Sequence, residues 1–217
     1  MPGLQLVIGN KNYSSWSLRP WLLLRQMGLE FEEILIPLFR EDWKAEVLKH
    51  SPSGKVPVLI EDGRTIWDSL AIAEYLAEKY PRMNLWPEDP AARAMARSVS
   101  AEMHSSFAAL RTECPMNVRR KPVPIELKPE VQADVARIQE IWREARSRHS
   151  KFGPFLFGHF SIADAMYAPV VFRFTRYAIE MDATARAYAE TILGLPAIQE
   201  WIQAALAETW MIPMNEK

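Results

Sequence analysis

The sequence predicts a two-part fold, with an α/β segment followed by an all-helical segment. Up to about residue 80, short β-type apolar runs alternate with helical patterns, whereas after residue 90 every apolar pattern has helical spacing. Between them, the stretch "PRMNLWPEDP" holds three prolines in ten positions, which a continuous helix does not tolerate. We therefore expect a first domain over residues 1–80, a linker over 81–90 and an all-α domain over 91–217.

The first domain is predicted to have the element order βαβαββα. Its β-type runs are "LQLVIG", "FEEILIPL", "VPVLIE" and "RTIW". Pro20 has no N–H to donate, so we place it among the first three residues of its helix, with the N-cap at about Ser17. Ser69 is expected to cap the third helix. The helical patterns cover residues 18–28, 41–50 (the poorest) and 69–80.

The second domain is predicted to consist of helices only. In "FSIADAMYAPVVF", Ser161 and Asp164 have the spacing of a capping box, and Phe160 precedes them as a hydrophobic staple. This motif predicts the start of a core helix, with a role in folding. The helical patterns cover residues 91–113, 130–149, 162–178, 183–193 and 196–208.

Composition and charge exclude several functional classes. The chain has 217 residues, 49% of them hydrophobic and 24% charged, and its formal net charge is −1. No basic field exists to recruit nucleic acid or an anionic membrane, and no signal peptide or 18-residue apolar run is present, so we expect a soluble, cytoplasmic protein. The single cysteine, Cys114, excludes an internal disulfide and a CxxC pair, and the four scattered histidines lack metal-ligand spacing, so no metal is expected.

The stretch "SPSGKVPVLIEDGRTIWDSLAIAEYL" predicts a binding site for a small peptide. Pro57 opens a β run, and a cis bond before it would leave the N–H and C=O of Val56 free to pair with an extended peptide. Asp68 and Ser69 open a helix, where backbone N–H groups and a hydroxyl can hold a carboxylate while the Asp68 carboxylate accepts from an ammonium group. Both ends of an amino-acid head group would bind there.

These motifs together resemble the cytosolic glutathione transferase family. The resemblance rests on Lys55-Val56-Pro57, on Asp68-Ser69 before "LAIAEYL", on the proline-broken linker and on "SIADA". It implies a thioredoxin-like first domain, a helical second domain, glutathione as co-substrate and a homodimer. It also implies that Lys55, Val56, Pro57, Asp68 and Ser69 bind glutathione. Where the family usually has Glu or Gln, this chain has Asp68, whose side chain is one methylene shorter.

The serine-rich stretch "NKNYSSWSLRP" then has an explanation. "SSWS" is similar to the "SSCS" signature of zeta-class members, which implies Ser14 as hydrogen-bond donor to the glutathione thiolate, with Ser15 and Tyr13 as alternatives. The signature cysteine is replaced by Trp16. Lowering a thiol pKa of ~8.5 by two units takes about 2.7 kcal/mol. One hydroxyl bonded to a charged acceptor supplies ~1.5–3 kcal/mol, and a helix N-terminus adds ~0.3–1 kcal/mol.

Other candidate residues have weaker motifs. Besides Lys55, His50 could reach the glycyl carboxylate of glutathione, and Arg19 could raise the positive field at the thiolate or form a surface ion pair. The resemblance implies that the helix after residue 91 forms a wall of a pocket for a small hydrophobic electrophile, although a Met/Phe stripe is more often core. The candidate pocket residues are Met103, His104, Phe107 and Arg111.

Two hypotheses about function follow. The first is a serine-type glutathione transferase that conjugates glutathione to an electrophile or isomerises an activated double bond, as maleylacetoacetate isomerases do. The second is a non-catalytic binding or interaction protein that keeps only the fold. The motif content favours the first.

Overall fold

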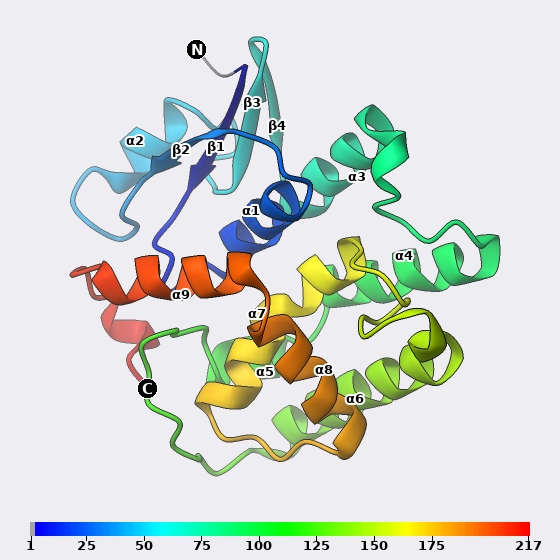
Figure 1. Ribbon diagram of the computed structural model, residues 1–217. Helices are drawn as coiled ribbons and strands as arrows, with labels where there is room; N and C mark the ends of the chain where they lie inside the picture. The colour runs from blue at the N-terminus through cyan, green and yellow to red at the C-terminus, as the bar shows by residue number, and fades with distance from the viewer. Residues whose placement is uncertain (1–2) are drawn as a thin grey trace.

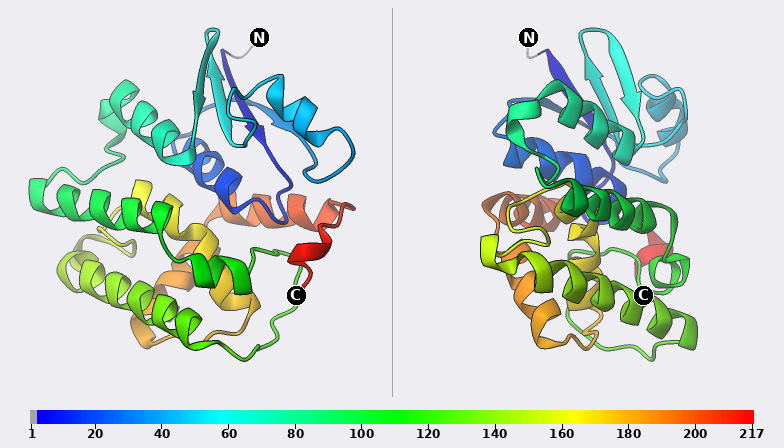
Figure 2. Two further views of the ribbon diagram at one scale, coloured as in Figure 1. Left: turned by 180° about the vertical axis from the view of Figure 1, so that it is seen from behind. Right: turned by 90° about the vertical axis from the view of Figure 1, so that its right-hand side faces the viewer.

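The computed structural model describes residues 3–217 and has two parts. A mixed four-stranded sheet with its helices forms the first part, and a bundle of helices forms the second (Figures 1 and 2). The strand order is β2-β1-β3-β4, with β1 parallel to β2 and antiparallel to β3, which is antiparallel to β4. The predicted order βαβαββα is confirmed. The elements are β1 (Leu4–Ile8), α1 (Ser15–Gln26), β2 (Glu32–Leu35), α2 (Trp43–Leu48), β3 (Val58–Glu61), β4 (Arg64–Trp67) and α3 (Ser69–Lys79).

The central strand β1 is buried on both faces, which explains its nearly continuous apolar run. Leu6 and Ile8 are fully buried in the main core, which also contains residues of α1 and α3. Val7 points to the other face, where it packs with Val47 of α2 in a smaller core. The sheet is thereby fixed between helices, with α1 lying between the sheet and the helical part (Figure 1).

Helix α1 begins three residues earlier than Pro20 led us to expect. Its N-cap is Ser14 and not Ser17, and Pro20 lies inside the helix. The carbonyl of Ser14 accepts from Leu18 N–H at 3.2 Å, and the Ser14 hydroxyl accepts from Ser17 N–H at 3.4 Å. These capping bonds allow the helix to begin closer to the N-terminus than the position of Pro20 alone would predict.

Helix α3 is capped by Asp68 and not by Ser69. Oδ1 of Asp68 accepts from the N–H groups of Leu70 and Ala71 at 2.8 and 3.2 Å, and Ser69 is the first helical residue. Asp68 has a positive φ of 75°, which turns the chain sharply from β4 into the helix. The Asp68 carboxylate therefore caps α3, in addition to the ligand-binding role that the sequence predicts for it.

The second part of the chain contains six α-helices among the residues described. The single helix expected over 91–113 is two helices, because Phe107 adopts a positive φ of 62° between them and is buried in the core. A carboxylate oxygen of Asp134 then accepts from Leu110 N–H at 2.9 Å in the first turn of the second helix. The helices are α4 (Pro90–Ser105), α5 (Ala108–Glu113), α6 (Pro129–His149), α7 (Ile162–Arg176), α8 (Ala183–Leu193) and α9 (Pro196–Ala207).

The capping box predicted at α7 is confirmed. Ser161 N–H and the Ser161 hydroxyl both donate to one carboxylate oxygen of Asp164, at 2.9 and 3.0 Å. The other oxygen accepts from Leu156 N–H and the Tyr188 hydroxyl, both at 3.1 Å. Asp164 is completely buried, and burial raises its pKa to about 6. The motif therefore joins the start of α7 to α8, and α7 packs directly against α1.

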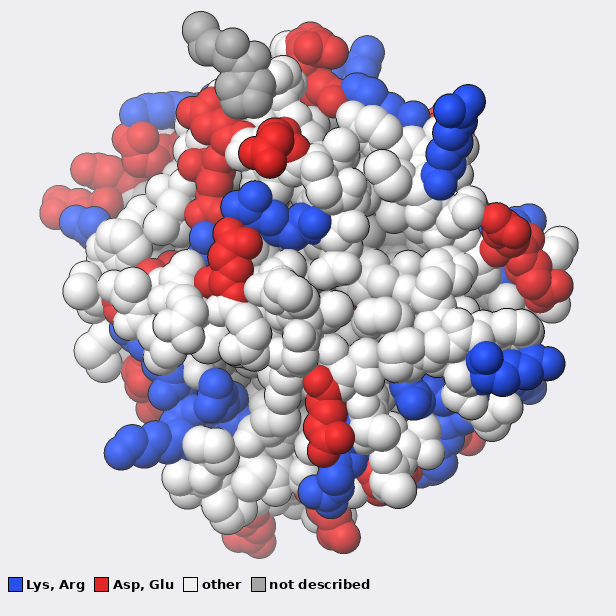
Figure 3. All heavy atoms as spheres, viewed as in Figure 1, with Lys and Arg blue, Asp and Glu red and all other residues white. Residues whose placement is uncertain are grey.

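The surface agrees with the near-zero net charge. On the face in Figure 3, acidic and basic side chains are interspersed, and no wide area carries basic charge alone. Within residues 3–217, no helix combines the length and apolar character needed to cross a bilayer. The same residues contain no cluster of three or more histidine, cysteine or carboxylate side chains placed to hold a metal ion.

Candidate active site

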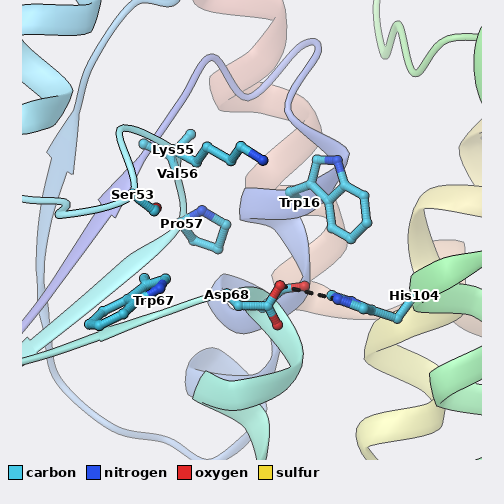
Figure 4. Close-up of a pocket in the computed structure, with 9 residues that line it drawn as sticks. Trp16, Ser53, Lys55, Val56, Pro57, Trp67, Asp68 and His104 are labelled. Carbon is cyan, nitrogen blue, oxygen red and sulfur yellow. Dashed lines mark ion pairs between the residues drawn. The ribbon is translucent and has the colours of Figure 1, made fainter.

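The larger of two neighbouring cavities lies where the start of β3, the start of α3, α1 and α4 meet (Figure 4). Its volume is about 600 Å³. The start of β3 and the start of α3 come together because the β3–β4 hairpin returns the chain to the same end of the sheet. All five residues predicted to bind glutathione line it. The complete lining is Trp16, Ser53, Lys55, Val56, Pro57, Trp67, Asp68, Ser69 and His104.

One wall of this cavity is the segment leading into β3. The Val56–Pro57 bond is cis, and β3 begins only at Val58, so the main chain of Val56 lies beyond the β ladder. The side chain of Lys55 extends over the cavity toward Trp16 (Figure 4). Lys55 is exposed and has no acidic partner within residues 3–217, so its ammonium group is available to an anionic ligand.

The opposite wall carries Asp68 and Ser69. The second carboxylate oxygen of Asp68, Oδ2, lies 3.1 Å from Nε2 of His104 on α4. The Ser69 hydroxyl is buried and has no hydrogen-bond partner within the described part of the chain. A buried hydroxyl without a partner is costly, so a polar ligand group is the natural complement to Ser69.

His104 belongs to this larger cavity, although we had expected it in an electrophile pocket. Burial lowers its pKa, the nearby Arg19 and Arg111 lower it further, and Asp68 opposes them. The imidazole is therefore neutral at pH 7, so its Nε2–H donates to Asp68 and its Nδ1 is a bare acceptor. The ring also packs edge-on against Trp16, with ring centroids 5.3 Å apart. His104 thus joins the helical part of the chain to the start of α3.

A smaller cavity of about 290 Å³ lies on the other side of Trp16 and contains the predicted serines. Ser14 and Ser15 are both nearly buried, at 7% and 6% exposure, and they sit at the positive end of α1. The lining has no acidic residue. It consists of Tyr13, Ser14, Ser15, Trp16, Leu38, Phe39, Arg111, Pro115, Met116, Arg173, Ile212 and Asn215.

Three arginines gather around this cavity. The Arg173 guanidinium donates to the Ser15 hydroxyl at 3.3 Å, and its burial lowers its pKa to about 10. Arg19 and Arg111 place their guanidinium carbons 4.3 and 4.7 Å from the Trp16 ring centroid. Arg19 is 1% exposed, and neither of its terminal nitrogens has a partner within residues 3–217. Positive charge is therefore concentrated beside the serines. Within residues 3–217 no carboxylate forms an ion pair with any of the three arginines, and Asp68 acts on Arg19 only at longer range.

Of the four residues expected to line an electrophile pocket, only Arg111 lines the smaller cavity. Met103 and Phe107 are 1% and 5% exposed and belong to the hydrophobic core, which is the alternative that a Met/Phe stripe allows. Sequence reasoning missed Arg173 as a site residue. A signal was present, because Arg173 is the first charged residue after Asp164 in α7, and the residues between them are apolar apart from the hydroxyl of Tyr167.

The loop before Ser14 is held by the end of the chain. A buried carboxylate, Glu208, accepts from the N–H groups of Lys11 and Asn12 at 2.6 and 3.0 Å. The indole N–H of Trp201 donates to the Lys11 carbonyl at 2.8 Å. Tyr13 donates to Glu216 and accepts from Arg119, so its hydroxyl is already engaged by the C-terminal part of the chain.

Comparison with known proteins agrees with this architecture. The family description "Glutathione S-transferase, N-terminal domain" matches residues 13–79, and "Glutathione S-transferase, C-terminal domain" matches residues 128–204. The chain is 30% identical to a zeta-class glutathione S-transferase of Euphorbia esula over 161 residues, which are 73% of this chain and 68% of that protein.

The chain belongs to the glutathione S-transferase family. It is also similar to the maleylacetoacetate isomerase of Rattus norvegicus, with 37% identity over 100 residues. These residues are 45% of each chain, so the match covers less than half of that relative. Its fold matches a Burkholderia glutathione transferase homologue solved with bound glutathione, with a TM-score of 0.71, 24% identity and coverage of 94% of this chain and 99% of that one.

Cys114 lies outside both cavities, and we predict that it is unreactive in the native protein. Burial raises the pKa of its thiol to about 11, so the thiolate is scarce at neutral pH. A thiol reagent should modify Cys114 at least ~100-fold more slowly in the native protein than in denaturant. Mass spectrometry after turnover checks the same point, because a mixed disulfide of glutathione with Cys114 would contradict this assignment.

Proposed function

We propose that this family member binds glutathione in the larger cavity and uses Ser14 to stabilise its thiolate at the entrance to the smaller one. The main support for this proposal is that the two cavities share a lining residue. Trp16 lines both cavities, and Ser14 stands at the positive end of α1 on the side of the smaller cavity. A tripeptide lying along Pro57 with its γ-glutamyl group at Asp68 and Ser69 would bring its thiol to this end of α1.

The thiolate would meet a favourable field there. Its stabilisation would come from the Ser14 hydroxyl, the positive end of the α1 dipole and the positive charge of Arg19. Ser14 is favoured over Tyr13, whose hydroxyl is engaged by Glu216 and whose pKa is raised by burial. Ser15, whose hydroxyl accepts from Arg173 and keeps its own proton, is the alternative donor.

We further propose that the second substrate is a small electrophile that carries a negative charge. Arg111 and Arg173 line the smaller cavity, none of whose described lining residues is acidic, and the remaining wall is largely apolar. The thiolate sulfur would form a bond to the electrophilic carbon. In conjugation that bond remains, and the electron pair displaced from the electrophilic carbon either leaves with a departing group or, after addition to a double bond, takes up a proton. In isomerisation the sulfur adds to one carbon of an activated double bond, the remaining single bond rotates, and expulsion of the thiolate restores the double bond without consuming glutathione.

The first prediction concerns the γ-glutamyl site. Asp68→Asn keeps an oxygen to cap α3 but removes the charge that attracts an ammonium group, so glutathione affinity should fall roughly tenfold. Ser69→Ala should weaken binding about three- to tenfold, because one hydrogen bond to a carboxylate is lost. Titration calorimetry measures both, with the exposed Ser98→Ala as the matched control. If the affinity for glutathione is unchanged in both site variants, glutathione does not bind in the larger cavity as proposed.

The second prediction concerns Ser14. Ser14→Ala removes a hydrogen bond to a charged acceptor, so the pKa of bound glutathione should rise by about one to two units, while glutathione affinity changes little. At neutral pH the rate with a reactive electrophile should fall roughly ten- to a hundredfold, and raising the pH should recover part of it.

Ser15→Ala is the control for that experiment. If it gives the pH-rescuable loss and Ser14→Ala does not, the donor is Ser15. If neither variant shifts the thiol pKa, serine activation is wrong for this chain, and a binding protein without useful turnover becomes the better description.

The third prediction concerns the charge of the electrophile. Arg111→Gln should raise KM for an electrophile with a free carboxylate roughly tenfold, because a charge-assisted hydrogen bond is lost. The amide or methyl ester of the same electrophile is the matched control, and its kinetics should be nearly unchanged. Equal effects on the charged and the neutral compound would show that Arg111 acts only through the shape of the cavity.

A further inference from the structure

Ser17 is the one serine of "SSWS" that lines neither cavity, yet its hydroxyl is tied to the site. It is completely buried, and its Oγ lies 2.7 Å from Oγ of Ser14. The same Oγ accepts from the N–H of Gly9, which follows β1 directly, at 3.1 Å. A short chain of hydrogen bonds therefore runs from the end of the central strand, through Ser17, to Ser14.

Gly9 packs closely against the start of this loop. A Cβ built on Gly9 would lie 2.6 Å from Cδ1 of Leu38 and 3.3 Å from Cβ of Ser14, so a side chain there would displace the Leu38 side chain and crowd Ser14. With glycine, the backbone comes near enough for its N–H to reach Ser17. The position of the Ser17 oxygen is thus fixed by main-chain geometry.

Which of the two hydroxyls donates in the Ser14–Ser17 hydrogen bond follows from the acceptors within reach of each proton. Among residues 3–217, the structure shows one acceptor within reach of the Ser17 hydroxyl proton, and that acceptor is Oγ of Ser14. If Ser14 donated to Ser17 instead, the buried Ser17 proton would have no partner, which is unfavourable. Ser17 therefore donates and Ser14 accepts, and the proton of Ser14 is left to point into the smaller cavity.

We propose that Ser17 is a positioning residue that orients and polarises the hydroxyl of Ser14 for its bond to the thiolate. The inference rests on the proposed role of Ser14. A hydroxyl that accepts a hydrogen bond becomes a better donor, and each bond of such a chain strengthens the next by ~10–30%. The same contact holds the Ser14 rotor in one of its three staggered positions, so the donor is aimed before glutathione arrives.

Ser17→Ala tests this role through the pKa of bound glutathione, read from the ultraviolet absorbance of the thiolate. The pKa should rise by about half a unit to one unit, and the neutral-pH rate should fall about three- to tenfold, less than for Ser14→Ala. In a Ser14→Ala background, adding Ser17→Ala should produce no further shift, because Ser17 acts only through Ser14.

Ser161→Ala is the matched control, since Ser161 is also a completely buried serine at a helix start but lies at α7. It should lower stability to urea without moving the thiol pKa. If Ser17→Ala does not fold, Ser17→Cys takes its place, and its weaker thiol donor should give a smaller shift in the same direction.

The outcomes separate the two proposals. A shift in Ser17→Ala that disappears without Ser14 supports the positioning role. A shift that persists without Ser14, or a Ser17→Ala variant with the wild-type thiol pKa alongside a shifted Ser14→Ala, overturns it and leaves the role of Ser14 intact. No shift in Ser14→Ala overturns the proposed function itself.

Discussion

The carboxylate of Glu208, buried between the two parts of the chain, is the constraint on which the site depends. It accepts from two consecutive backbone N–H groups, those of Lys11 and Asn12, and so fixes a loop almost 200 residues away in sequence. Asn12 is held further by Asn117, at 3.0 Å. Because this loop leads directly into Ser14 at the start of α1, the helical part of the protein sets where the N-terminal hydroxyls stand. The α/β part alone would leave that loop without these partners.

A second constraint is electrostatic. Within residues 3–217, Arg19 and Arg173 are buried with no carboxylate in ion-pair contact. The fold tolerates this because stacking on Trp16 and hydrogen bonds to backbone carbonyls and to Ser15 offset part of the cost. An anion bound beside them would offset much of the remainder. The same buried positive charge that is unfavourable in the free protein would thus favour a thiolate over a thiol. The arginines would then contribute both to the binding of glutathione and to the ionisation of its thiol.

Sequence reasoning brought together those cavity-lining residues that lie close to one another in sequence. Pro57, Asp68 and Ser69 flank a hairpin and a helix start, so their meeting follows from the order of elements alone. His104 and Arg173 could not be assigned in this way, because which face of α4 or α7 meets a cavity depends on tertiary packing, with α7 packed against α1 and α4 packed against α7. The start of α1 was misplaced for a related reason: the proline rule was outweighed by capping bonds from Ser14, whose strength depends on a loop held by distant residues.

Stabilisation of a thiolate at the start of α1 can be measured by titrating the thiol of glutathione bound to the wild-type protein. We expect saturable binding, with the thiolate absorbance appearing at a pKa of ~6.5, about two units below the ordinary value for a thiol. Glutathione that binds in the larger cavity and still titrates near ~8.5 would contradict it, because the hydroxyls and positive charge at the start of α1 would then serve some purpose other than holding a thiolate.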